Sequence, residues 1–168
     1  IDPGLRVTGY GVIFNSSGSI RYEASGVIKT TNKDTNLASR IKIILLGLEE
    51  VIHQFKPDCV AIEKVFVNTN PQSTLLLGQA RGAAISAAVM QNLDVYEYTA
   101  LQVKKSVVGM GHASKSQVQI MVQKLLNLPS IPSSDSADAL ACSICHANIS
   151  GSIAKFGTGN RMKSGRII

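Results

Sequence analysis

The sequence has no tryptophan, few other aromatic side chains and a modest share of charged residues. Only 17% of its 168 residues are Asp, Glu, Lys or Arg, whereas 45% are hydrophobic. So low a charged fraction argues against a long acidic or basic disordered chain. The length and the apolar content together favour one compact domain with a core of its own.

Cysteine and long apolar runs are also scarce. The three cysteines are an odd number and lie in apolar segments, so they do not form a disulfide framework. The longest apolar stretch, residues 75–90, contains Gln79 and Arg81 and is too short to span a bilayer. The first residues lack the charged segment and apolar run of a secretory signal. We therefore expect a cytoplasmic protein without a membrane segment.

Acidic residues are outnumbered by basic ones. The sequence has 11 Asp and Glu against 17 Lys and Arg, which gives a net charge of +6 and a pI near 9.4. A basic protein favours a polyanionic partner, because binding to phosphates releases condensed counterions. Nucleic acid is the leading candidate, and a basic protein without such a partner is the alternative.

The hydrophobic pattern predicts two neighbouring strands followed by alternating helices and strands. Strands are expected at 8–14, 19–30, 59–65 and 95–99, and helices at 37–55, 72–90, 114–128 and 133–147. Ser114 and Gln117 form the capping box of the third helix. This order indicates an α/β fold with a mixed sheet and helices on both faces. We expect one domain over residues 1–150 and a basic, flexible tail over 151–168, which contains no acid.

Four acidic residues stand in unusual places. Asp2 precedes a Pro-Gly turn, and Glu63 lies inside an apolar strand, where an unpaired carboxylate is costly. Asp135 and Asp138 are three apart on a helix and so share a face, although acids in a first helical turn also complement the helix dipole. Oxygen ligands without a His or Cys cluster select Mg²⁺ or Mn²⁺. Two such ions about 3.5–4 Å apart can hydrolyse a phosphodiester.

Five segments resemble, in the same order, motifs of the RuvC family of Holliday-junction resolvases. They are Ile1-Asp2-Pro3-Gly4 with Arg6 to Val12, Ala61 to Phe66, Leu77 to Gly82, Val107 to Gly109, and Asp135 to Leu140. Each motif is weak alone, but five in register from Ile1 to about Ala147 are specific.

The resemblance implies an RNase H-like fold with a mixed five-stranded sheet, an antiparallel meander followed by parallel strands, flanked by helices. It also implies a homodimer that resolves four-way DNA junctions in recombination and repair by paired, symmetric, Mg²⁺-dependent nicks. By position, Asp2, Glu63, Asp135 and Asp138 are the catalytic ligands of two Mg²⁺ ions, for which Mn²⁺ can substitute. The family has a strand leading into Ile1, so we expect the sequence to be truncated there.

The resemblance also assigns contacts with DNA and with other proteins. Phe66 matches an aromatic side chain that lies against unpaired bases, although a residue just past a strand is more often part of the core. Lys104 and Lys115 match basic residues that contact DNA and support catalysis. Arg81 either packs its stem among small residues or touches a phosphate. The implied partners are RuvA and RuvB.

Two other functions fit the same residues. A junction-binding module without catalysis is disfavoured by the full set of carboxylates, since a pure DNA binder gains by losing buried negative charge. A nuclease acting on RNA–DNA hybrids fits the chemistry equally well, and only the resemblance favours junctions. Cys142, Cys145 and His146 match the spacing for haem attachment, but they continue a periodic helix, so we expect no haem.

Overall fold

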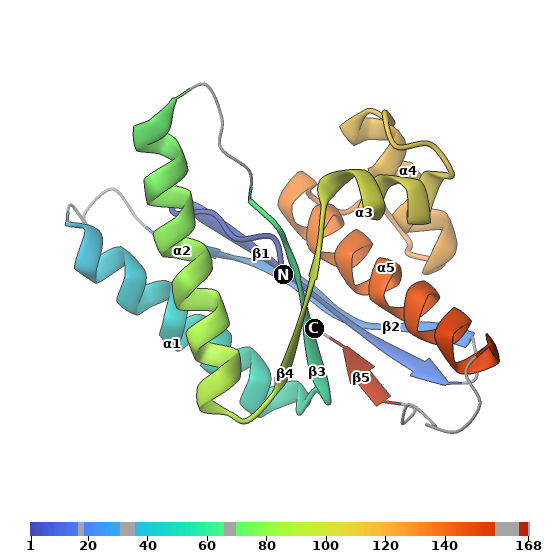
Figure 1. Cartoon of the computed structure of the whole chain (residues 1–168), viewed down its shortest axis with the longest axis horizontal. Helices are drawn as coiled ribbons and strands as arrows, with labels where there is room; N and C mark the ends of the chain where they lie inside the picture. Colours follow the sequence, from blue (N-terminus) through green and yellow to red (C-terminus); the bar gives the residue numbers. More distant parts are fainter. Residues whose placement is uncertain (17–18, 31–35, 66–69, 157–164, 168) are drawn as a thin grey trace.

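The computed structural model describes residues 1–16, 19–30, 36–65, 70–156 and 165–167. It consists of a five-stranded sheet with helices on both faces (Figure 1). The elements in chain order are β1 (Val7–Ser16), β2 (Ser19–Lys29), α1 (Leu37–Phe55), β3 (Cys59–Glu63), α2 (Pro71–Met90), β4 (Asp94–Tyr98), α3 (Ala100–Val108), α4 (Lys115–Leu125), α5 (Ser134–Phe156) and β5 (Gly165–Ile167). None of these helices is long and apolar enough to cross a membrane.

The sheet has the strand order β2-β1-β5-β3-β4 and is mixed, as expected. β1 and β2 form the antiparallel meander, with an irregularity between Val12 and Ile13. β3 and β4 are parallel. The position between β1 and β3 is filled from one end by β5, where Ile167 lies opposite Ile13 and Cys59. From the other end it is filled by Ile1 and Asp2.

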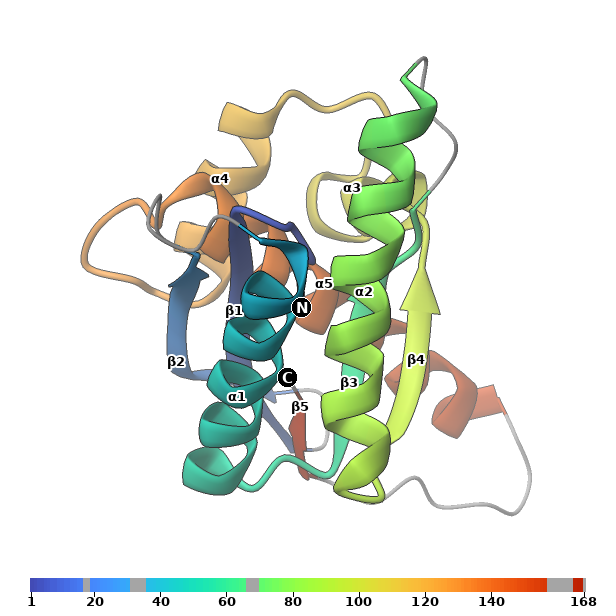
Figure 2. The same ribbon diagram turned by 90° about the vertical axis from the view of Figure 1, so that its left-hand side faces the viewer.

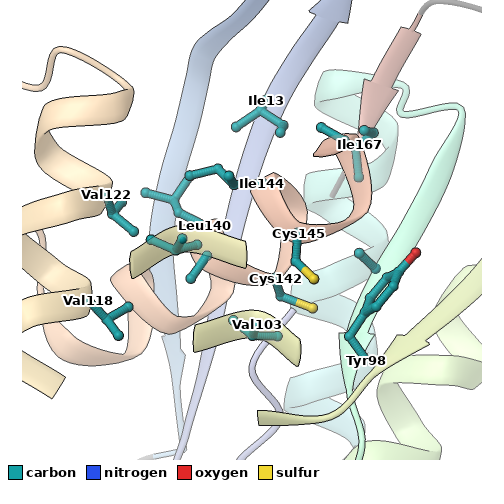
Figure 3. Close-up of a cluster of buried hydrophobic side chains, with 14 of the residues drawn as sticks. Ile13, Tyr98, Val103, Val118, Val122, Leu140, Cys142, Ile144, Cys145 and Ile167 are labelled. Atoms are coloured by element: carbon teal, nitrogen blue, oxygen red, sulfur yellow. The ribbon is translucent and has the colours of Figure 1, made fainter. Parts of the chain in front are cut away.

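Each face of the sheet has its own hydrophobic core. α1 and α2 cover one face, and α3, α4 and α5 cover the other (Figures 1 and 2). The first core includes Ile44, Leu48, Val60 and Ile62, together with five buried alanines of α2. The second, shown in Figure 3, gathers side chains from α3, α4 and α5 under the sheet.

The second core contains the residues with haem-like spacing. Cys142 and Cys145 are fully buried among Val103, Leu140 and Tyr98 (Figure 3). His146 is 2% exposed, and its Nδ1 lies 2.7 Å from the Tyr98 hydroxyl. The spacing therefore reflects packing of α5 against the sheet.

Two expectations for the chain need correction. α3 was not predicted, although Thr99 and Gln102 form a capping box of the same kind as Ser114 and Gln117. The proposed tail is not entirely outside the fold, because α5 extends to Phe156 and residues 165–167 form β5. Burial of Ile167 and backbone hydrogen bonds to β1 and β3 explain this strand. The backbone N–H of Arg166 also donates to the Asp58 carboxylate at 2.6 Å.

Candidate active site

Asp2 lies between β1 and β3, held by backbone hydrogen bonds on both sides. Its N–H donates to the Gly9 carbonyl at 3.0 Å, and the Gly9 N–H returns a bond to the Asp2 carbonyl at 2.9 Å. On the β3 side, the Ile1 nitrogen donates to the Ala61 carbonyl at 2.6 Å and the Glu63 N–H to the Ile1 carbonyl at 3.3 Å. Because Ile1 is fully buried, this segment is fixed and Asp2 lies beside Glu63.

Glu63 is the last residue of β3, at the carboxyl end of two parallel strands. It pairs in register with Tyr98 of β4, and the next residue, Lys64, donates its N–H to the Tyr98 carbonyl at 2.7 Å. The residues before it, Val60 to Ile62, are fully buried. Parallel α/β sheets bind ligands outside the carboxyl ends of their strands, which is where Glu63 lies.

Asp135 and Asp138 are brought to the same place by the start of α5. Ser133 stabilises this start, because its Oγ accepts the N–H of Ser136 at 3.4 Å. α5 then runs against β1 so closely that a Cβ on Gly9 would lie 2.1 Å from the Asp135 carbonyl oxygen. Gly9 is also the residue paired with Asp2. A glycine in the strand thus lets the two acid-bearing segments meet.

The acids are close enough to influence one another's pKa. Burial raises the pKa of the Asp2 carboxyl from 3.8 to about 7, and the negative charges of Asp138, Glu63 and Asp135 add to that rise. Burial also raises the pKa of Glu63 and of Asp138. The contributions of the neighbouring charges, which are smaller than that of burial, are those of like charges near one another.

Two lysines border the cluster and oppose this effect. Nζ of Lys115, the first residue of α4, lies 3.5 Å from Oδ2 of Asp138 and lowers the pKa of that carboxyl. The Lys104 ammonium on α3 lowers the pKa of both Glu63 and Asp138. The Lys115 side chain is 73% exposed, so it can also reach a ligand in solvent.

The donor chemistry of the cluster fits a hard divalent cation. The residues offer carboxylate oxygens, burial raises the pKa of Asp2, Glu63 and Asp138, and a bound cation would offset the repulsion within the cluster. As the side chains stand, no three His, Cys, Asp or Glu residues in the described ranges are close enough together to hold an ion. Cation binding by these residues therefore needs side-chain rotation toward a common centre.

The structure places six of the seven candidate residues at or beside this cluster. Phe66 lies outside the described residues. The sequence did not single out Glu97, whose carboxylate on β4 forms an ion pair with Arg81. Nothing in the local sequence marks this pair, because Arg81 and Glu97 lie on different elements.

A mixed sheet with carboxylates at the ends of its central strands, covered by helices on both faces, defines an RNase H-like nuclease. The family model described as crossover junction endodeoxyribonuclease RuvC matches residues 1–146. The chain belongs to this family, whose members are metal-dependent nucleases.

Individual relatives agree over nearly their whole length. The crossover junction endodeoxyribonuclease RuvC of Methylobacillus flagellatus is 61% identical, covering 100% of this chain and 96% of the relative. The corresponding protein of Azoarcus sp. is 58% identical, covering 100% and 91%. The structure of Thermus thermophilus RuvC in complex with a Holliday junction substrate superposes with a TM-score of 0.83 at 34% identity, covering 90% of this chain and 93% of that one.

Proposed function

We propose that this chain resolves four-way DNA junctions by paired symmetric nicks, and that Asp2, Glu63, Asp135 and Asp138 are its catalytic metal ligands. One observation carries the assignment of the ligands. Three segments far apart in the sequence bring these carboxylates to one end of the central strands, where burial raises the pKa of Asp2 to about 7 and the charges of Asp138, Glu63 and Asp135 add to that rise. A fold gains no stability from such repulsion, so a ligand is the better explanation.

The proposed cofactor is Mg²⁺, two ions in each site, with Mn²⁺ as a substitute. Carboxylate oxygens without sulfur or imidazole donors suit both ions. When bound, such ions activate a water molecule and stabilise the leaving oxygen of the phosphodiester.

The side chains of the chain itself would bind and orient the DNA strand. Lys115 and Lys104 offset negative charge next to Asp138 and Glu63, so that a phosphate can approach an acidic site. Lys115 is exposed enough to bind a phosphate directly.

Without cation, Asp2 holds a proton over much of the range below pH 7, and it must release this proton to become a ligand. The scissile phosphate is proposed to lie at the carboxyl end of β3, next to Glu63 and the start of α5. Phe66 is proposed to lie against unpaired bases at the crossover.

A homodimer is proposed because symmetric nicks need two active sites. α2 supports it: the side chains of Leu75 and Val89 are 69% and 57% exposed, and a Cβ on Gly78 or Gly82 would meet nothing within 4 Å. These four residues share one helix face by their spacing. Glycine in an open helix face costs about 1 kcal/mol relative to alanine, so close packing against a second chain is a reason to keep it.

The remaining proposals follow from the family. RuvA and RuvB are the proposed protein partners, and the cytoplasm is the proposed location. The described residues are proposed to act as one nuclease domain, which includes α5 to Phe156 and β5 as well as the expected residues 1–150. The Thermus protein was solved with a Holliday junction substrate, which favours junctions over RNA–DNA hybrids as the substrate here.

The test is cleavage of a labelled four-way junction in Mg²⁺, with linear duplex and an RNA–DNA hybrid as competing substrates. Asp138→Asn is the inactive variant, and Glu50→Gln is its matched control, because Glu50 is an exposed acid on α1, outside the cluster. We expect paired symmetric nicks from the wild type and Glu50→Gln, and none from Asp138→Asn, which should still bind the junction. Tight junction binding without any cut, in Mg²⁺ or Mn²⁺, would leave only a binding module, and preferred cleavage of the hybrid would indicate an RNase H-type enzyme.

A further inference from the structure

Arg81 of α2 reaches across to the end of β3 and makes two contacts with the sheet. Its Nε donates to the backbone carbonyl of Glu63 at 3.2 Å. A terminal nitrogen of the same guanidinium forms an ion pair with the Glu97 carboxylate on β4. The Arg81 side chain is only 21% exposed.

The Glu63 carbonyl needs this donor because of the residue opposite to it. Between parallel strands, the N–H and the carbonyl of one residue bond to two residues of the neighbouring strand. If its N–H donates to the carbonyl of one residue there, its carbonyl accepts from the N–H two residues further on. Glu63 donates to Ile1, so its own carbonyl should accept from residue 3. Residue 3 is proline, which has no N–H, and it is buried. Arg81 therefore supplies the hydrogen bond that the backbone cannot.

The ion pair with Glu97 fixes where this donor lies. Glu97 is in register with Ile62, the residue before Glu63, on the neighbouring strand. A guanidinium has a rigid planar set of donors, so one end can bond a carboxylate while Nε bonds a carbonyl. A lysine at the same place has a single nitrogen and no such fork.

The charge of Arg81 is matched by Glu97, which makes it a poor candidate for a phosphate contact. After burial, the largest influence on the pKa of the Glu63 carboxyl is the charge of Asp138, which raises it, and the side chains that lower it are Lys104 and Lys115. Arg81 touches only the backbone of that residue. Its effect on Glu63 is thus geometric.

We propose that Arg81, anchored by Glu97, is a positioning residue that replaces the missing Pro3 donor at the Glu63 carbonyl and so holds the Glu63 carboxylate in place as a metal ligand. This inference rests on the proposed role of Glu63. Groups that hold metal ligands in place typically change metal affinity or activity by about 10- to 100-fold when they are replaced. Junction affinity should not change, because the proposal has Arg81 contact Glu63 and Glu97 and not DNA.

The experiment measures Mn²⁺ binding to the DNA-free protein by calorimetry, and single-turnover junction cleavage as a function of Mg²⁺. The variants are Arg81→Gln, Arg81→Lys and Glu97→Gln. Arg21→Gln is the matched control, since Arg21 forms an exposed ion pair with Glu23 on β2. Thermal unfolding of each variant reports whether the fold is kept.

We expect Arg81→Gln to weaken Mn²⁺ binding by about 10- to 100-fold and to raise the Mg²⁺ needed for half-maximal cleavage. Arg81→Lys should rescue stability but not metal affinity, because it can restore the ion pair without the second bond. Combined with Glu63→Gln, Arg81→Gln should cause no further loss of Mn²⁺ affinity.

The inference is overturned if Arg81→Gln leaves Mn²⁺ binding unchanged, or if it weakens junction binding and reduces its salt dependence, as loss of a phosphate contact would. It is also overturned if the loss persists in full in the Glu63→Gln background. Failure of the proposed function looks different: the wild type would not cut junctions, whereas the effect of Arg81 on Mn²⁺ binding could still be measured.

Discussion

The carboxyl of Asp2 gives the sharpest test of the site, because its burial among other acids should cost stability that a cation can restore. Its pKa is raised from 3.8 to about 7, first by burial and then by the charges of Asp138 and Glu63. The folded chain therefore holds this proton more tightly than the unfolded chain does. It follows that the metal-free protein loses stability as the pH rises from about 4 to about 7, and that the loss is complete above this range.

Asp2→Asn removes the charge and keeps the size of the side chain and its backbone pairing with Gly9. A rise of the pKa from 3.8 to about 7 corresponds to about 4 kcal/mol, at about 1.4 kcal/mol for each pKa unit. The amide of asparagine must still be desolvated at this position, which reduces the gain. We expect Asp2→Asn to raise the free energy of unfolding by about 2–4 kcal/mol at a pH of about 8 without divalent cation.

The assay is urea unfolding of the wild type, Asp2→Asn and the exposed-acid control Glu50→Gln, at about pH 5 and pH 8, with and without Mg²⁺. Mg²⁺ at about one hundred times its Kd should stabilise the wild type by about 2.7 kcal/mol. Asp2→Asn should gain much less from Mg²⁺ and should not cut junctions. If Asp2→Asn is less stable than the wild type at pH 8 without Mg²⁺, or keeps the full pH dependence, the account of the cluster is wrong.

Three further changes test the surroundings of the cluster. Lys115→Gln should raise the pKa of Asp138, so that the rise of the cleavage rate with pH shifts to higher pH. It should also reduce the slope of the logarithm of junction affinity against the logarithm of salt concentration by about one. Burial lowers the pKa of His146 from 6.5, so the unfolded chain takes up this proton first and the wild type should lose stability as the pH falls below 6.5. His146→Gln should remove this loss. Gly9→Ala would put its Cβ 2.1 Å from the backbone oxygen of Asp135, so it should cost about 1–3 kcal/mol in urea unfolding and abolish cleavage.

Two of these changes have a control variant in the same chain, and the third is compared with the wild type. Lys124→Gln removes an exposed lysine at the other end of α4 and should leave the pH profile unchanged. Gly151→Ala adds a Cβ that meets nothing within 4 Å, so it should not destabilise the protein. The raised pKa values of Asp2, Glu63 and Asp138 increase stability as the pH falls, which is opposite to the effect of His146. The His146 prediction is therefore tested by comparing how the urea midpoints of the variant and of the wild type change with pH. Equal slopes in the two proteins would contradict it.

Much of the fold could be predicted because its signals are local. The helix at 37–55 coincides with α1, and the capping box at Ser114 begins α4 as expected. α3 was missed although Thr99 and Gln102 carry the same local signal, since Thr99 was assigned to the preceding strand. β5 could not be predicted, because three residues form a strand here only through the edges that β1 and β3 offer them.

The site was predictable to a different degree. A carboxylate inside an apolar strand marks Glu63 from sequence, and the spacing of Asp135 and Asp138 marks one helix face. The contact of Arg81 with the Glu63 carbonyl has no such signal, since it depends on the distance between α2 and the end of β3. Sequence left open whether Arg81 packs its stem or binds phosphate, and the structure gives a third answer.

The place of the cluster follows from two residues that interrupt regular structure. Pro3 cannot donate to Glu63, so the ladder between the first residues and β3 ends at Asp2 and leaves its side chain at the end of the sheet. Gly9, the partner of Asp2, has no Cβ, so the start of α5 can lie against it and bring Asp135 and Asp138 alongside. Pro3 follows Asp2 in the chain, and Gly9 pairs with Asp2 across the sheet. Changes at either residue should therefore affect cation binding more than they affect the distant core around Val122.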